Sequence, residues 1–103
     1  MVSTEMLNCN DLPPGSLIDV ETKSRHYHIE CLGGTAILVS GHPDYCPEPV
    51  QASLQGSVDQ EGTLEVGSIG CGMRMIFLLD DVRPITTSSV LHVSVEQPKA
   101  STR

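Results

Sequence analysis

Two histidines and a glutamate at alternating positions are the residues of this chain best arranged to do chemistry. His26, His28 and Glu30 occur in the run SRHYHIECLGG, at every second position. In a β-strand, alternate side chains point to the same face, and their Cα atoms lie about 6–7 Å apart. Imidazole and carboxylate groups at that spacing suit zinc or another divalent metal. The pattern is equally typical of the solvated face of a strand, so both interpretations stay open.

Two other segments carry reactive groups without a complete set. In the loop GHPDYCPEP, His42 and Cys46 are four residues apart, but a nucleophilic cysteine also needs an orienting third group. In GSIGCGM the glycines are not followed by the Lys-Ser/Thr of a phosphate loop, although a small anion or ligand near this segment is a further option. With no Ser-His-Asp set, spaced acid pair or cofactor motif, we expect no enzyme and assign no catalytic residue.

The four cysteines bear on both metal binding and redox chemistry. They occur at positions 9, 31, 46 and 71, and no two are close enough in sequence to form a CxxC motif. The sequence therefore indicates neither a zinc ribbon nor a dithiol redox motif. We expect four free thiols, some of them packed as small apolar core residues.

The charge balance limits the partners to be expected. Thirteen acidic residues against six basic ones give a formal net charge of −7. Such a surface repels phosphate backbones and anionic membranes, because binding to both depends largely on Lys and Arg. We expect no nucleic-acid or membrane partner. The start, MVSTEMLNCN, lacks the basic region and apolar run of a secretory signal, so the expected location is the cytoplasm.

Short alternating segments about ten residues apart suggest the fold that positions these groups. Apolar and polar residues alternate in SLIDVE, RHYHIECL, VQASLQGS, MRMIFLL and ITTSSVLHVSVE, and Gly or Pro interrupts every long candidate helix. The fold class predicted is all-β: a small, partly open barrel of five to seven strands with short hairpins and a Pro-rich loop. The barrel domain is expected at residues 14–96, with a flexible N-terminal arm at 1–13 and a flexible C-terminal tail at 97–103.

The register of one hairpin decides which side chains face the core. A two-residue turn at Gly33 and Gly34 would place Ile29 opposite Leu38. The expected core face of this hairpin then gathers Tyr27, Ile29, Cys31, Ala36 and Leu38. A turn one residue longer would exchange the two faces of the second strand.

Apolar residues on both faces of two strands suggest a partner. In the predicted register Ile37 and Val39 share the outer face with the histidines, and Ile76 and Leu78 lie on the second face of MRMIFLL. A solvated sheet does not need such residues, so these four side chains form the predicted interaction surface. The leading interpretation is a non-enzymatic protein-interaction or assembly module that binds a protein partner or self-associates. The alternative is a protein that binds zinc or another divalent metal through His26, His28 and Glu30.

Several runs resemble a group of small bacterial all-β barrel proteins with no assigned function. The runs are GSLIDVETKSRHYHIECLGGTAILVSG, PEPVQASLQGS, GSIGCGMRMIF and ITTSSVLHV, which together span about Gly15 to Val95. The resemblance implies a small barrel. Because the group has no established activity, it implies nothing about mechanism.

Overall fold

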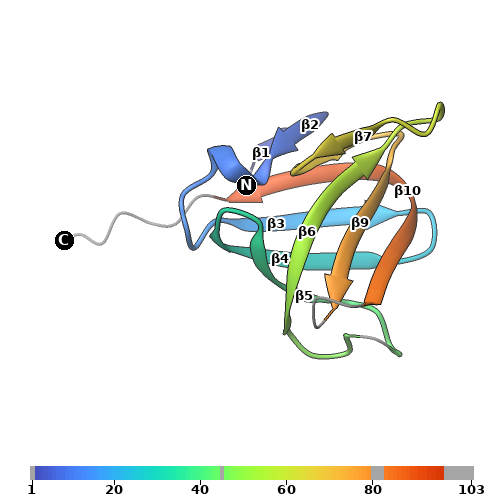
Figure 1. Ribbon diagram of the computed structural model, residues 1–103. Helices are drawn as coiled ribbons and strands as arrows, with labels where there is room; N and C mark the ends of the chain where they lie inside the picture. Colours follow the sequence, from blue (N-terminus) through green and yellow to red (C-terminus); the bar gives the residue numbers. More distant parts are fainter. Residues whose placement is uncertain (1, 45, 80–82, 97–103) are drawn as a thin grey trace.

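The structure, a computed structural model, describes residues 2–44, 46–79 and 83–96 (Figure 1). The regular elements within these ranges are β-strands and one short 3₁₀ helix. None of the described residues form a helix that is long and apolar enough to cross a membrane. The elements are β1 (Val2–Thr4), β2 (Met6–Asn8), η1 (Cys9–Asp11), β3 (Leu17–Thr22), β4 (His26–Gly33), β5 (Ala36–Ser40), β6 (Val50–Val58), β7 (Leu64–Val66), β8 (Ser68–Gly70), β9 (Arg74–Leu79) and β10 (Arg83–Glu96).

Six antiparallel strands are hydrogen-bonded in a ring, which confirms the predicted all-β, partly open barrel. The order around the ring is β3, β4, β5, β6, β9 and β10, and β10 closes it against β3. The long strand β10 makes this closure because its first part pairs with β9 and its second part with β3 (Figure 1). Its register shifts between Thr86 and Ser89, and such irregularities bend a strand.

The core lies inside this ring and follows the predicted alternation in most strands. On β9 and just before it, Met73, Met75, Phe77 and Leu79 are buried, as predicted. Phe77 also contacts Tyr27 of β4 edge-on, with ring centroids 6.0 Å apart. Three of the four cysteines are buried among these residues and behave as small apolar side chains.

The turn between β4 and β5 differs from the prediction. Gly33 pairs with Ala36, and an irregularity between Cys31 and Gly33 adds one residue to the β4 side. Ile29 therefore lies opposite Val39 rather than Leu38. A shift of one residue exchanges the faces of a strand, so the predicted register is wrong.

This shift corrects which residues of β5 are buried. Ile37 and Val39, expected on the outer face, are completely buried in the core. Leu38 is half-buried on the outer face, and Ala36 is exposed. The predicted core face therefore holds for Tyr27 and the rest of β4 but not for β5.

The expectation of a flexible arm at residues 1–13 is also corrected. Strand β1 pairs with β10, and β2 pairs with β8. Cys9 in η1 is buried and belongs to the core cluster. Each of β1, β2 and η1 is only three residues long, too short to show an alternating pattern in the sequence. The predicted tail at 97–103 lies outside the described residues.

Candidate functional site

The β3–β4 hairpin places polar side chains from two different strands next to one another. Thr22 closes its turn, because the Thr22 hydroxyl donates to the Arg25 carbonyl at 2.9 Å and accepts from the Arg25 amide at 3.0 Å. The resulting register places Asp19 opposite His28 and Glu21 opposite His26. These four side chains share the outer face, since their neighbours along each strand are in the core.

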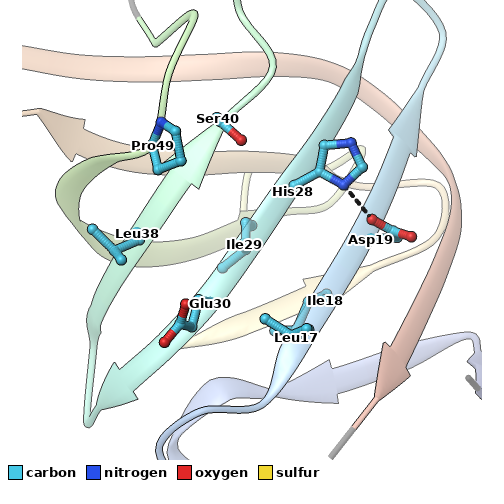
Figure 2. A pocket seen from close by; sticks show the side chains of 9 residues that line it. All are labelled: Leu17, Ile18, Asp19, His28, Ile29, Glu30, Leu38, Ser40 and Pro49. Carbon is cyan, nitrogen blue, oxygen red and sulfur yellow. Dashed lines mark hydrogen bonds and ion pairs between the residues drawn. The ribbon is translucent and has the colours of Figure 1, made fainter.

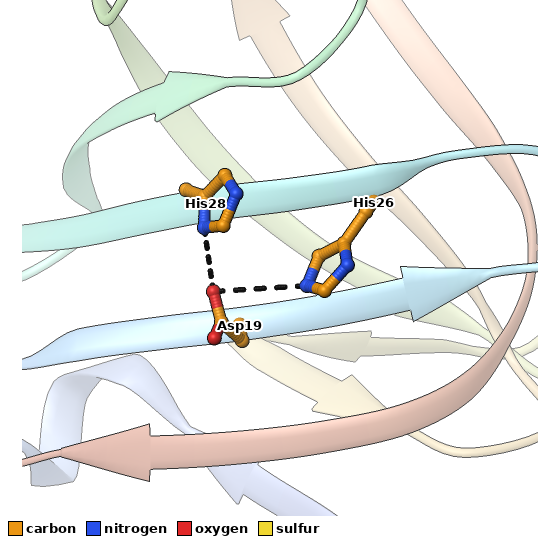
Figure 3. A group of neighbouring side chains, drawn as sticks. All are labelled: Asp19, His26 and His28. Carbon is orange, nitrogen blue, oxygen red and sulfur yellow. Dashed lines mark hydrogen bonds and ion pairs between the residues drawn. The ribbon is translucent and has the colours of Figure 1, made fainter. Parts of the chain in front are cut away.

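Asp19, His26 and His28 form a compact group of potential metal ligands (Figure 3). Asp19 Oδ1 lies 2.6 Å from His28 Nδ1 and 3.8 Å from His26 Nε2. The two imidazole rings are stacked at a centroid distance of 4.9 Å and an interplanar angle of 16°. One ligand atom from each residue lies within 4.8 Å of the others. The side chains are 28%, 54% and 63% exposed for Asp19, His26 and His28, so the group is open to solvent.

This donor set has the chemistry of a three-ligand metal site. Two imidazole nitrogens and one carboxylate oxygen are common ligands of zinc, which binds them at about 2.0–2.2 Å. The corresponding spacing between ligand atoms on one zinc ion is about 3.3 Å in tetrahedral geometry. The pairs at 2.6 and 3.8 Å bracket that value, and rotation of exposed side chains would adjust them. Three protein ligands leave a coordination position for water or another group.

The group of potential ligands contains the two predicted histidines, but its third member is Asp19 and not Glu30. Glu30 lies on the same strand as the histidines but outside the group, because it pairs across the sheet with Leu17 and Leu38. Asp19 takes its place as a potential ligand. The signal for Asp19 was present in SLIDVE: pairing this strand with RHYHIECL across the ETKSR turn places an acidic residue opposite His28.

A shallow pocket of about 400 Å³ adjoins the Asp19–His28 pair on the outer face (Figure 2). Leu17 and Leu38 lie on opposite sides of Glu30, and Pro49 extends the apolar wall. The polar end is formed by the Asp19–His28 pair. This arrangement suits a small molecule with one apolar and one polar end. Its lining residues are Leu17, Ile18, Asp19, His28, Ile29, Glu30, Leu38, Ser40 and Pro49.

Among the described residues of the Pro-rich loop, Cys46 has the environment of a buried structural cysteine. His42 and Cys46 form an isolated backbone bridge, and the Asp44 amide donates to His42 Nδ1 at 3.1 Å. Cys46 is completely buried. Burial raises the pKa of the Cys46 thiol, whereas an activated cysteine nucleophile needs a lowered pKa.

The glycine-rich segment packs against the N-terminal segment, and two of the four residues of the predicted interaction surface lie in the core. A Cβ atom at Gly67 or Gly70 would meet side chains of the N-terminal segment, including Asn8 and Met6. Of the four residues predicted to form an interaction surface, Ile37 and Val39 are buried in the core. Ile76 and Leu78 on β9 are half-buried.

Comparisons with known proteins give no further assignment for the site. No family model, curated protein or solved structure matches the chain. The resemblance to small bacterial barrel proteins stays a prediction.

Proposed function

We propose that this protein binds one divalent metal ion, preferably zinc, through Asp19, His26 and His28 on the outer face of the β3–β4 hairpin. The observation that carries the proposal is the convergence of one carboxylate and two imidazoles within 4.8 Å. Two adjacent strands supply the ligands, so the ligand spacing is set by a rigid sheet rather than by a loop. A metal site held in this way needs only side-chain rotation to close.

Electrostatics and ligand type support a cation and favour zinc among the common ones. The formal net charge of −7 attracts cations to the surface. Magnesium and calcium prefer oxygen ligands, whereas imidazole suits zinc, copper and nickel. The 2.6 Å contact between Asp19 Oδ1 and His28 Nδ1 holds two of the proposed ligand atoms side by side, and zinc would take the place of the proton between them.

The test is a titration of untagged protein with zinc, in which isothermal titration calorimetry measures the stoichiometry and the affinity. We expect one zinc ion per chain, with the affinity lowered at least about 10-fold in His28→Ala and Asp19→Asn, because each variant removes a ligand. His92→Ala is the matched control, since His92 is an exposed strand histidine outside the group. Glu30→Gln distinguishes the group seen in the structure from the set predicted from sequence, because only the predicted set includes Glu30. This variant should bind zinc with the affinity of the wild type.

Three outcomes of this titration would contradict the proposal. One is the absence of measurable heat and of any change in melting temperature on adding zinc. The second is unchanged zinc affinity in both ligand variants, which would place the bound metal elsewhere. The third is equal loss in His92→Ala and His28→Ala, which would contradict a specific site.

A second candidate function is self-association through the edge of β7. All three residues of β7 are exposed, and Leu64 and Val66 are 43% and 65% exposed. The strand stands at one end of the sheet order and pairs with β6. Exposed apolar edge strands readily pair with another strand, and a second copy of β7 would provide one in antiparallel orientation.

Light scattering at two salt concentrations tests this second function. Two chains of charge −7 repel each other, and salt screens that repulsion. We therefore expect a mass above the monomer's 11.1 kDa that rises with protein and salt concentration. Val66→Lys should abolish the increase, whereas Leu91→Lys, at an exposed leucine on β10, should not. A monomer under all conditions would rule it out.

A further inference from the structure

Two buried cysteines from distant parts of the chain are in direct contact. Cys9 Sγ of η1 lies 3.0 Å from Cys31 Sγ of β4, and each residue is 1% exposed. Both residues are free thiols. Sulfur atoms at this distance are closer than ordinary apolar packing brings them, and one thiol can donate a hydrogen bond to the other.

Main-chain hydrogen bonds hold both cysteines in position. The Cys9 amide donates to the Gly67 carbonyl at 2.9 Å, which ties η1 to the chain between β7 and β8. The Cys31 amide donates to the Ser16 carbonyl at 2.9 Å, and the Cys31 carbonyl accepts from the Gly15 amide at 2.7 Å. The thiol contact is therefore built by the sheet and its connections, and it does not depend on one flexible side chain.

We propose that Cys9 and Cys31 are an oxidation site that forms an intrachain disulfide by exchange with a small-molecule disulfide such as oxidised glutathione. The other two cysteines do not share this geometry. Cys46 is buried in the Pro-rich loop beside His42. Cys71 is exposed, and its thiol faces the Thr4 carbonyl at 3.8 Å.

The exchange proceeds in two balanced steps. The Cys9 thiolate attacks one sulfur of the oxidant and forms a mixed disulfide, releasing the first small thiol. The Cys31 thiolate then attacks Cys9 Sγ, forms the intrachain bond and releases the second small thiol. The two cysteines lose two electrons and two protons, and the oxidant takes up both pairs as its two thiols.

The environment of the pair indicates the order of attack. The hydrogen bond with the Cys31 thiol lowers the pKa of Cys9. The same hydrogen bond and burial raise the pKa of Cys31. This lowered pKa, together with the position of Cys9 directly after β2 in the segment that must open, favours Cys9 as the attacking group and Cys31 as the group that resolves the mixed disulfide.

Access to the pair requires opening of the N-terminal segment. Strands β1 and β2 contain three residues each, and each pairs with one strand. Short edge elements of this kind open locally at lower free energy than the core. Oxidation would then close the segment onto β4 covalently, because Cys9 follows β2 directly.

Differential labelling of the full chain tests the proposal. Native protein is incubated with oxidised glutathione, unfolded with iodoacetamide, then reduced and treated with N-ethylmaleimide. In Cys71→Ser, which lacks the exposed thiol that would itself form a mixed disulfide with glutathione, we expect the second label on Cys9 and Cys31 and the first label on Cys46, located by tandem mass spectrometry. Trypsin should also release peptides 1–23 and 26–74 as one disulfide-linked pair before reduction, because it cleaves after Lys23, Arg25 and Arg74. Fragmentation of this pair should place the bond at Cys31 and not at Cys46 or Cys71.

A thermal measurement and two variants complete the test. A disulfide closing the loop from Cys9 to Cys31 should raise the melting temperature by about 10 °C or more. Cys31→Ser should abolish this oxidant-dependent rise, whereas Cys71→Ser should retain it. Labelling of Cys9 and Cys31 by iodoacetamide after full exposure to the oxidant would overturn the proposal, as would a disulfide that joins Cys71 to either residue or links two chains.

Discussion

At the scale of single residues, the hydroxyl of Thr87 compensates for an irregularity in the sheet. Thr87 is buried at the point where the β9–β10 register shifts. Its Oγ1 accepts from the Met75 amide at 3.1 Å and donates to the Ser88 carbonyl at 2.7 Å. Thr87→Val keeps the shape of the side chain but leaves the Met75 amide without this acceptor.

We expect Thr87→Val to lower the free energy of unfolding by about 1–3 kcal/mol, the cost of leaving a buried donor unpaired. Urea denaturation of the variant measures this directly. Thr87→Ser retains the hydroxyl and should lose less. Thr86→Val, at the exposed neighbouring position, should change the free energy of unfolding by about 0.5 kcal/mol at most. Equal losses at positions 86 and 87 would contradict the assigned role.

Two buried acidic groups predict loss of stability at alkaline pH. Burial is the main reason that the pKa of Cys46 lies above its ordinary value of 9.0 and that of Tyr27 above 10.0. Above the ordinary values the unfolded chain loses these protons while the folded chain keeps them. The unfolded state then binds fewer protons, so the stability present below about pH 9 declines as pH rises.

The expected slope is about 1.4 kcal/mol per pH unit for Cys46 above pH 9 and about the same again for Tyr27 above pH 10. Melting temperatures measured from pH 7 to pH 11 on reduced protein would show it. Cys46→Ala should make the decline shallower just above pH 9, because the variant removes one of the groups. A flat profile up to pH 11 would contradict the assigned burial effect.

Only part of the candidate site could be predicted from the sequence of a single strand. His26 and His28 share a face because strand alternation depends on the local sequence alone. Asp19 belongs to a neighbouring strand, and its position depends on the pairing across the Thr22–Arg25 turn. Glu30 was predicted because it continues the same alternation, but cross-strand neighbours are closer than the second residue along a strand.

At the scale of elements, Gly56 allows β6 to change partners. The β6–β9 register shifts between Leu54 and Gly56, and Gly56 lies opposite Val66 of β7. Its φ is +142°, and an added Cβ would collide with the Glu65 carbonyl oxygen. Both the conformation and the close approach of the two strands require glycine here.

Gly56→Ala should therefore lower the free energy of unfolding by about 3 kcal/mol or more, through backbone strain and overpacking together. Gly62→Ala is the matched control: its φ is +86°, but no atom lies within 4 Å of an added Cβ. Only the conformational cost of about 1–2 kcal/mol applies there. Chemical denaturation of both variants gives the comparison, and a smaller loss at position 56 than at position 62 would refute the argument.

The β4–β5 hairpin shows how a correct element can have a wrong register. The two strands and the glycine turn between them were predictable from alternation and from the Gly-Gly pair. The extra residue between Cys31 and Gly33 was not, because both glycines adopt positive φ in either arrangement. The register is instead decided by which face of β5 is apolar. The longer turn buries Ile37 and Val39 in the core, which is more favourable than leaving them on the outer face.

At the scale of the whole molecule, the N-terminal segment belongs to the fold rather than extending from it. Short strands, mixed polarity and the absence of a clear period make residues 1–13 look unstructured in the sequence. In the structure, β1 extends the sheet beside β10 (Figure 1), and β2 pairs with β8. Long-range pairing of this kind brings the two ends of the described chain together and leaves no local sequence pattern.

Deleting residues 1–8 is therefore expected to lower the free energy of unfolding by about 2 kcal/mol or more, since it removes two strand pairings and the packing of the half-buried Leu7. Amide hydrogen exchange should also become faster in β8, which would lose its partner strand. Deletion of residues 97–103, predicted from the sequence to be a tail, provides the comparison and should leave stability unchanged. If the two truncated chains were equally stable, the N-terminal strands would contribute nothing to the barrel, and Cys9 would reach its place beside Cys31 without them.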